Sequence, residues 1–598
     1  MRATRTMVIL LLGMGLAAFT KADSPVIVEK PLTDGDRAHW AYGPLAPVKT
    51  PDAGSGNPVD VLLLSSPVMR GRGFAPSADP ATLLRRLTFD LTGLPPTPEA
   101  LTAFLKAPSD NAYLAEVERL LRSKACAENL ARHWLDLARF AETDGFEFDT
   151  VRSGAWRYRD WVVEALQRDL PYDEFVRAQI AGDLLEGQPD RDWLALGSGF
   201  LLSGPDMPDV NDQEERRHTL LNEMTGTVGV VFLSTSLGCA QCHDHPYDPV
   251  SQADFYRMRA VFEETVTPAA RKPIGTVVRA SAPGLAPLPR LWVRGDPHTP
   301  GPEVTAAAPR ILRGEASEAL PIGGERLAFA RWLTSETNAI FLRSIANRLW
   351  QWHFGQPLVA TPNDFGTLAA IPDQGVLLDW LAGELPRRAW SIREMQRLLV
   401  TSQAYRQRGG TSKEDSFRNR RRLSGEEIRD ALLSLSGALN PKPGGPGVRY
   451  PLPPEITVTL LANQREVDPD PAEHDRRSLY LFARRNLRHP LFDAFDRPDA
   501  LASCARRPVS TTAPQALMLL NSPFTHRLAG LAAARVAASG DAQIDGWIER
   551  ASRLILSRDP TPQERQLATA FFDGQVDSSR LADFCLALFN SNAFLYVE

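Results

Sequence analysis

The feature that most constrains the fold is a helical spacing of apolar residues, which begins near Pro98 and returns in most later segments. Leu130, Trp134, Leu137 and Phe140 follow one another at i, i+4, i+7 and i+10, which places their side chains on one face of an α-helix. Strand-like pieces are few. The sequence therefore predicts a mainly α protein with minor β structure. Its last helices are expected at residues 513–520, 524–538, 542–557, 561–574 and 578–589.

Two helical domains are expected, because a chain of 598 residues is too long for one ordinary hydrophobic core. Residues 266–320 are rich in Pro, Ala and Gly, with one strand-like piece at 291–293. This composition is typical of connecting segments and predicts a Pro/Gly-rich linker. The first helical domain is predicted at residues 81–265 and the second at residues 321–590. Residues 23–80 are rich in Pro, Gly and Asp, and we expect them to form an extended lead-in.

The N-terminus has the pattern of a secretory signal peptide. Arg2 and Arg5 are followed by an apolar run from 7 to 19 and by a possible cleavage site at 20–22. An uncleaved membrane anchor is the alternative, but the apolar run is short for a membrane span. We therefore predict that residues 1–22 are a signal peptide and that the protein is exported, to the periplasm or beyond the cell.

Charge and composition narrow the functional classes. The net charge is -5, and the arginines alternate with Asp and Glu, which suits internal ion pairs better than a nucleic-acid surface. No stretch after the signal peptide is long and apolar enough to cross a bilayer. Five cysteines are too few for a disulfide-dense scaffold. We therefore predict no nucleic-acid binding and no transmembrane span after the signal peptide.

The densest chemistry lies in the cysteine motif, residues 239–249, which read Cys-Ala-Gln-Cys-His-Asp-His-Pro-Tyr-Asp-Pro. Cys-x-x-Cys-His is the attachment signature of c-type haem, in which two thiols add to the vinyl groups and the histidine binds the iron. Cys239 and Cys242 would then be the thioether anchors and His243 the proximal ligand. Export favours this interpretation, because haem c is attached outside the cytoplasm. The predicted function is redox chemistry or electron transfer.

A second axial ligand would have to come from another segment. His245 stands only two residues from His243, which is too close for it to reach the opposite face of the macrocycle. Met224, on the preceding predicted helix, is the main candidate, and Met258 and His218 are others. Core packing is the alternative explanation for both methionines. A filled sixth position would imply electron transfer, whereas a vacant one would imply small-molecule binding or peroxidase-like chemistry.

A non-haem metal site is the main alternative to haem. Zinc or iron could be held by Cys239, Cys242, His243, His245 and Asp248, because thiolates, imidazoles and carboxylates are all metal ligands. The protein could then be a carbohydrate-processing enzyme. In a third interpretation it is a non-catalytic envelope or scaffolding protein, and the two cysteines form a disulfide.

Charged and aromatic residues are interleaved between residues 134 and 161. In an enzyme, Asp144, Asp149 and Arg152 could line a cleft where carboxylates do acid/base work and Trp faces stack on a sugar. The alternative is a buried salt-bridge network that joins helices. The sequence identifies no catalytic residue within this segment.

Several motifs resemble a known pair of domains. Those of the first half resemble the second "planctomycete cytochrome C" type domain of large exported proteins. They are residues 85–98 (RRLTFDLTGLPPTP), 131–141 (ARHWLDLARFA), 156–161 (WRYRDW), 181–183 (AGD) and 238–245 (GCAQCHDH). Those of the second half resemble the domain that habitually follows it. They lie at 347–355, 361–366, 377–382, 422–430, 476–480 and 514–521.

The resemblance implies a setting rather than an activity. Both domains are of unknown function, and the cytochrome label rests on the Cys-x-x-Cys-His motif itself. Relatives often accompany exported sulfatases and polysaccharide-degrading systems. The expected partners are therefore a redox protein, which the haem interpretation predicts, or carbohydrate-degrading machinery of the cell envelope, which the resemblance implies.

Overall fold

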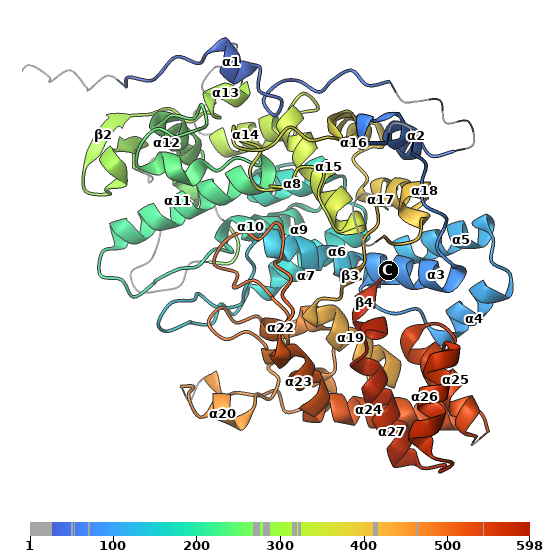
Figure 1. The fold of residues 1–598 in the computed structure, drawn as a ribbon. Helices are drawn as coiled ribbons and strands as arrows, with labels where there is room; N and C mark the ends of the chain where they lie inside the picture. The colour runs from blue at the N-terminus through green and yellow to red at the C-terminus, as the bar shows by residue number, and fades with distance from the viewer. Residues whose placement is uncertain are drawn as a thin grey trace, which may run out of the picture.

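The computed structural model describes residues 27–598 apart from 50–51, 53, 55, 70–71, 267–274, 279–286, 314–319, 321–323, 411–416, 462–463 and 542. The predicted signal peptide lies outside the described residues. Within them, helices dominate and the strands form two small antiparallel pairs (Figure 1). These are β1 (Arg290–Trp292) with β2 (Pro300–Glu303), and β3 (Arg421–Arg422) with β4 (Tyr596–Val597). The prediction of a mainly α protein with minor β structure is confirmed.

The helices of the first half, including the one in the predicted linker, are α1 (Asp34–Arg37), α2 (Pro58–Ser65), α3 (Pro80–Thr92), α4 (Pro98–Lys106), α5 (Asp110–Leu121), α6 (Lys124–Leu137), α7 (Trp156–Gln167), α8 (Tyr172–Ala181), α9 (Arg191–Ala195), α10 (Gly199–Leu202), α11 (Gln213–Phe232), α12 (Gln252–Ala260) and α13 (Arg310–Arg313). No helix among the described residues has the length and apolar character needed to cross a membrane.

The helices of the second half begin with α14 (Glu325–Leu333), α15 (Ala339–Phe354), α16 (Gly375–Arg387), α17 (Ile392–Val400), α18 (Gln403–Arg406), α19 (Gly425–Ser436), α20 (Pro454–Thr457), α21 (Pro471–His474) and α22 (Pro490–Ala494). The chain closes with α23 (Ala513–Asn521), α24 (Pro523–Ala538), α25 (Ile544–Leu556), α26 (Pro562–Phe572), α27 (Ser578–Phe589) and α28 (Asn592–Leu595). The five closing helices predicted from the sequence correspond to α23 through α27.

Local capping chemistry explains where α3 ends and α4 begins. Gly93 follows α3 with a φ of 67°, in the left-handed region that glycine adopts without steric cost. Thr97 caps α4 by accepting a hydrogen bond from the Ala100 N–H at 3.2 Å. Pro98 takes the first helical position, where its missing N–H is not needed.

Two clusters of buried apolar side chains form the core. The larger cluster draws on helices from α2 to α18, and the smaller one on α19 and on α22 to α28. Helix α3 contributes to both, with Leu87 in the larger cluster and Phe89 in the smaller. Helices on both sides of the predicted linker thus share one core, and the domain boundaries themselves stay a prediction.

The lead-in is held against the second half of the chain and runs along the top of the molecule in Figure 1. Arg343 on α15 donates to the carbonyl oxygens of Ala41 at 3.2 Å and Gly43 at 2.8 Å. Its Nε also donates to Asp379 on α16 at 2.6 Å. Asp379 in turn accepts the Ala46 N–H at 2.8 Å. One buried arginine and one carboxylate therefore fix the path of the lead-in.

Candidate functional site

The cysteine motif lies in an irregular loop between α11 and α12. The loop opens with a 3-10 helix, η4 (Leu237–Gln241), which carries Cys239. Cys239, Cys242 and His243 are exposed, and both cysteines are free thiols. The three residues assigned to haem from the sequence therefore lie together at the surface.

His243 is held in the tautomer that metal ligands have. Its Nδ1 lies 2.7 Å from the backbone carbonyl oxygen of Asp244. Because a carbonyl oxygen can only accept, Nδ1 carries the proton in the neutral ring and Nε2 keeps a free lone pair. Metal-binding histidines commonly donate their other ring N–H to a carbonyl or carboxylate in this way. The Nε2 atom of His243 is thus prepared to bind a metal.

His245 has the opposite arrangement. Its Nδ1 accepts the Asp248 N–H at 2.8 Å, so Nε2 carries the proton in the neutral ring. The side chains of His245 and Asp248 are 7% and 3% exposed. The His245 side chain therefore closes a turn. Its role as a metal ligand stays a prediction, and binding through Nε2 would need the other tautomer.

Asp248 ties the cysteine motif to the second half of the chain. Its Oδ1 accepts the Thr367 N–H at 2.6 Å, and the Thr367 hydroxyl donates to the Tyr247 carbonyl at 3.2 Å. Gly366 makes this approach possible, because a Cβ at that position would lie 2.4 Å from each Asp248 carboxylate oxygen. The loop after α15 thus packs directly against the motif.

The lead-in also approaches Asp248. Burial raises the pKa of the Tyr42 hydroxyl, and the Asp248 carboxylate raises it further. Burial lowers the pKa of His39, and the same carboxylate opposes that change. The Trp40 ring packs on Phe365 with 5.4 Å between ring centroids. Three separate segments therefore meet around Asp248.

Replacing Gly366 by alanine is expected to disrupt this meeting point. The added Cβ would displace Asp248 and break its contact with Thr367, and overpacking of this kind costs about 1–3 kcal/mol. Urea unfolding should show that loss, and limited proteolysis should show faster cutting near the motif. The matched control is Gly226→Ala on α11, where no heavy atom lies within 4 Å of the added Cβ. Equal stabilities of the Gly366 variant and the unchanged protein would contradict this account.

The residues proposed for a zinc or iron site are not gathered around one point. Within the described ranges, no group of three or more His, Cys, Asp or Glu side chains is arranged to hold a metal ion. Cys242 instead packs against Gly295, where a Cβ would lie 2.8 Å from the sulfur. A zinc or iron site built from Cys239, Cys242, His243, His245 and Asp248 stays a prediction.

The candidate axial ligands lie in the core. Met224 is 1% exposed, and its sulfur accepts a hydrogen bond from the Thr265 hydroxyl at 3.5 Å. Met258 is fully buried. His218 is buried with its Nδ1 3.2 Å from Arg259 Nη1, and burial lowers its pKa to about 4. All three are buried, whereas His243 is exposed, and axial ligation by Met224 stays a prediction.

Asp144, Asp149 and Arg152 are buried rather than open to a cleft. Arg152 donates to Asp144 and, at 2.7 Å, to the Leu202 carbonyl. Asp149 accepts the Gly145 N–H at 2.9 Å. Burial raises the pKa of Asp144, although Arg152 opposes the change. These contacts are those of a buried salt bridge, which was the alternative to a cleft in the sequence analysis.

A second constellation, which sequence reasoning did not single out, is a network of ion pairs next to α3, α6 and α19. It is called the buried ion network below, because four of its members are buried and the others partly buried. Asp90 is fully buried and accepts from Arg418 at 2.5 Å, from Arg421 at 3.0 Å and from the Tyr405 hydroxyl at 2.8 Å. Arg421 also donates to both oxygens of Glu427, at 3.0 and 3.1 Å. One carboxylate thus organises two arginines inside the protein.

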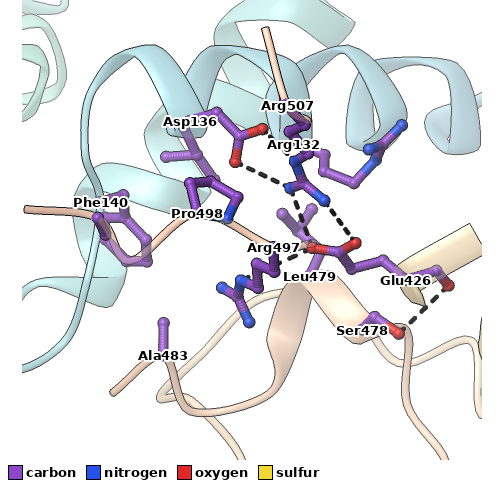
Figure 2. Close-up of a pocket in the computed structure, with 12 residues that line it drawn as sticks. Arg132, Asp136, Phe140, Glu426, Ser478, Leu479, Ala483, Arg497, Pro498 and Arg507 are labelled. Carbon is purple, nitrogen blue, oxygen red and sulfur yellow. Dashed lines mark hydrogen bonds and ion pairs between the residues drawn. The ribbon is translucent and has the colours of Figure 1, made fainter. Parts of the chain in front are cut away.

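Arg507 forms the other half of this ion network (Figure 2). Its guanidinium donates to both oxygens of Asp136, at 2.7 and 2.9 Å, and to both oxygens of Glu426, at 2.8 and 3.1 Å. Burial alone would raise the pKa of Glu426, but Arg507 and neighbouring arginines lower it to about 2. Arg132 joins the two halves, with Nη2 3.5 Å from Glu427.

Two protein families match the parts of the chain that hold most of these elements. Residues 58–267 match PSCyt2, a protein of unknown function (DUF1549). Residues 325–572 match PSD1, a protein of unknown function (DUF1553). The chain is a PSCyt2–PSD1 tandem protein. No curated protein and no solved structure gives a significant match, and the resemblance predicted from the sequence is confirmed.

The PSCyt2 and PSD1 domains meet in the buried ion network. The PSCyt2 part supplies three of its members and the PSD1 part supplies five; they are Asp90, Arg132 and Asp136, then Arg418, Arg421, Glu426, Glu427 and Arg507. Most of them belong to the motifs at 85–98, 131–141 and 422–430. The alternation of Arg with Asp or Glu in those motifs was the available signal. The two family domains are thus joined through residues that mostly lie in these motifs.

Proposed function

We propose that this PSCyt2–PSD1 protein is an exported, cytochrome-like protein that holds one haem covalently. Cys239 and Cys242 are the thioether anchors and His243 is the proximal ligand. The observation that carries the proposal is the contact of His243 Nδ1 with the Asp244 carbonyl at 2.7 Å, since it leaves Nε2 free to bind iron. Both thiols are exposed and unpaired, so an attachment enzyme can reach them.

The haem, when bound, supplies one-electron redox chemistry at the iron. The residues of the chain hold and orient it. The Asp244 carbonyl keeps the proton on Nδ1 of His243, and the turn closed by His245 and Asp248 fixes the loop. Met224 is the candidate sixth ligand, and its sulfur would have to leave the Thr265 hydroxyl to reach an iron.

The proposed setting is the periplasm or the cell exterior. Electron transfer or another redox reaction would serve a redox partner or the carbohydrate-degrading machinery that relatives accompany. The exposed position of the cysteine motif suits either partner, because electrons must pass between the haem and a second molecule.

The test is to express the full chain in a bacterium that attaches haem c and to purify it from the periplasm. The protein should be red and give a pyridine haemochrome spectrum after denaturation. Cys239→Ala/Cys242→Ala should lose that spectrum completely while keeping the same helical circular dichroism. The matched control is Cys126→Ala, which removes a buried thiol elsewhere and should keep the haem.

Other outcomes would favour the alternatives. A colourless protein from a competent host would overturn the haem proposal. Stoichiometric zinc or iron without haem would point to a non-haem metal enzyme. A peptide containing a Cys239–Cys242 disulfide would point to a non-catalytic envelope protein.

A further inference from the structure

A small, partly open cavity lies between the PSCyt2 and PSD1 domains, beside the buried ion network (Figure 2). Its free volume is about 40 Å³, which is room for a few water molecules or one small anion. Arg132 and Asp136 reach it from α6, and Glu426, Arg497 and Arg507 reach it from the PSD1 domain. The rest of the wall is mainly apolar: Leu135, Phe140, Leu479, Ala483, Pro498 and Ala500.

Positive charge is in excess around this cavity. Three arginines face two carboxylates, so the lining carries a net charge of about +1. Arg507 already donates to all four carboxylate oxygens of Asp136 and Glu426. The carboxylates of the lining are therefore satisfied. Arg132 is paired with Glu427, so the excess charge rests on Arg497.

Arg497 belongs to the ion network only through one long ion pair, with Glu426. Within the part of the chain that the structure describes, its nearest carboxylate oxygen is Glu426 Oε1, 3.7 Å from Nε, which is beyond hydrogen-bond distance. Its guanidinium lies over the Phe492 ring, 5.3 Å from the centroid. Figure 2 shows it turned away from Arg507, on the side of the cavity where Ala483 lies.

We propose that this cavity binds a small organic carboxylate, with Arg497 as the main ligand. A guanidinium pairs with a carboxylate through two parallel N–H···O bonds, and Arg497 has both of its Nη groups available. The apolar wall suits the hydrocarbon part of a short organic acid. Sulfate or phosphate would place further oxygens against that wall without donors, which is costly. This site is independent of the haem proposal.

An open surface groove adjoins the cavity, since the two have Pro498 in common. Pro498 lines both the cavity and the groove, whose other walls are residues 361–364, 499 and 502–506. The groove holds about 490 Å³, which is within the usual range for small-molecule sites. Asp364 in its wall accepts a hydrogen bond from Ser236 at 3.2 Å, directly before η4. The groove therefore borders the segment that leads into the cysteine motif.

The test is a calorimetric titration of the full-length protein with propionate at low ionic strength. We expect saturable binding of one propionate, and propionamide, which has the same shape without the charge, should not bind. Arg497→Gln should weaken propionate binding at least tenfold. The propionate affinity of Arg497→Lys should lie between those of the unchanged protein and Arg497→Gln, because lysine keeps the charge but lacks the planar guanidinium.

The matched control is Arg527→Gln, which removes an arginine that also lies over a phenylalanine, 5.7 Å from the Phe524 centroid, but outside the cavity. It should bind propionate as the unchanged protein does. The proposal is overturned if propionate does not bind, or if Arg497→Gln binds it equally well. Tighter binding of inorganic sulfate than of propionate would likewise overturn the assignment to an organic acid.

Discussion

Replacing Asp90 by asparagine is expected to lower the free energy of unfolding by about 3–5 kcal/mol, the usual cost of removing one partner from a buried ion pair. Asp90 and Arg418 are both fully buried, and Arg421 shares the same carboxylate. Asparagine has nearly the shape of aspartate, so the loss comes from the charge and not from a cavity. Urea unfolding followed by tryptophan fluorescence measures this loss in the free energy of unfolding. Urea is the suitable denaturant because it is uncharged and does not screen ion pairs.

The control for this prediction is Asp110→Asn. Asp110 pairs with Arg406 at 2.5 Å, but its side chain is 77% exposed. Exposed pairs of this kind contribute about 0–1 kcal/mol. A loss for Asp90→Asn no larger than the loss for Asp110→Asn would show that the buried ion network does not hold the domains together.

Acid is expected to destabilise the protein strongly below pH 4.5. Burial alone would raise the pKa values of Glu426 and Glu427, but the surrounding arginines lower both to about 2 from an ordinary 4.5. Because the folded state has the lower pKa, the stabilisation is complete above pH 4.5 and is lost as the pH falls toward 2. A difference of this size corresponds to about 3 kcal/mol for each carboxyl.

The measurement is the urea midpoint of the unchanged protein at a series of pH values between 7 and 3. The midpoint should be nearly level above pH 5 and should drop steeply below pH 4.5. Glu427→Gln should be less stable at pH 7, and its difference from the unchanged protein should shrink as the pH falls. Glu116→Gln, in an exposed pair with Arg119, should leave the profile unchanged. A level profile down to pH 3 would contradict the account.

Local features of the fold could be predicted because their causes are local. Apolar spacing and caps are properties of neighbouring residues, and the helix expected at 578–589 is observed as α27 (Ser578–Phe589). The pairing of β3 with β4 could not be predicted, since strands of two residues have no periodicity and the paired residues stand 174 and 176 positions apart. The core that helices α2 to α18 share could not be predicted either. Apolar spacing shows which face of a helix is buried, but not which other helix covers that face.

Of the two candidate sites, only the one formed by neighbouring residues could be predicted from the sequence. The cysteine motif is contiguous, so its chemistry was visible in the sequence. The ion network joins residues that are 328 positions apart for Asp90 and Arg418, and 371 positions apart for Asp136 and Arg507. The alternating charges of the motifs predicted salt bridges, but pattern alone does not pair one arginine with one carboxylate. Gly366 belongs to the motif at 361–366, but the sequence did not predict its role, because that role comes from the approach of Asp248.

The intact mass of the mature protein, purified from a host that attaches haem c, tests the haem proposal most directly. Each thiol adds across a vinyl group with no atom lost, so the mass should exceed that of the polypeptide by one whole haem. Proteolysis should place the addition on the peptide that contains Cys239 and Cys242. An unmodified polypeptide mass, or a mass lower by two hydrogen atoms with these cysteines in a disulfide, would contradict the proposal.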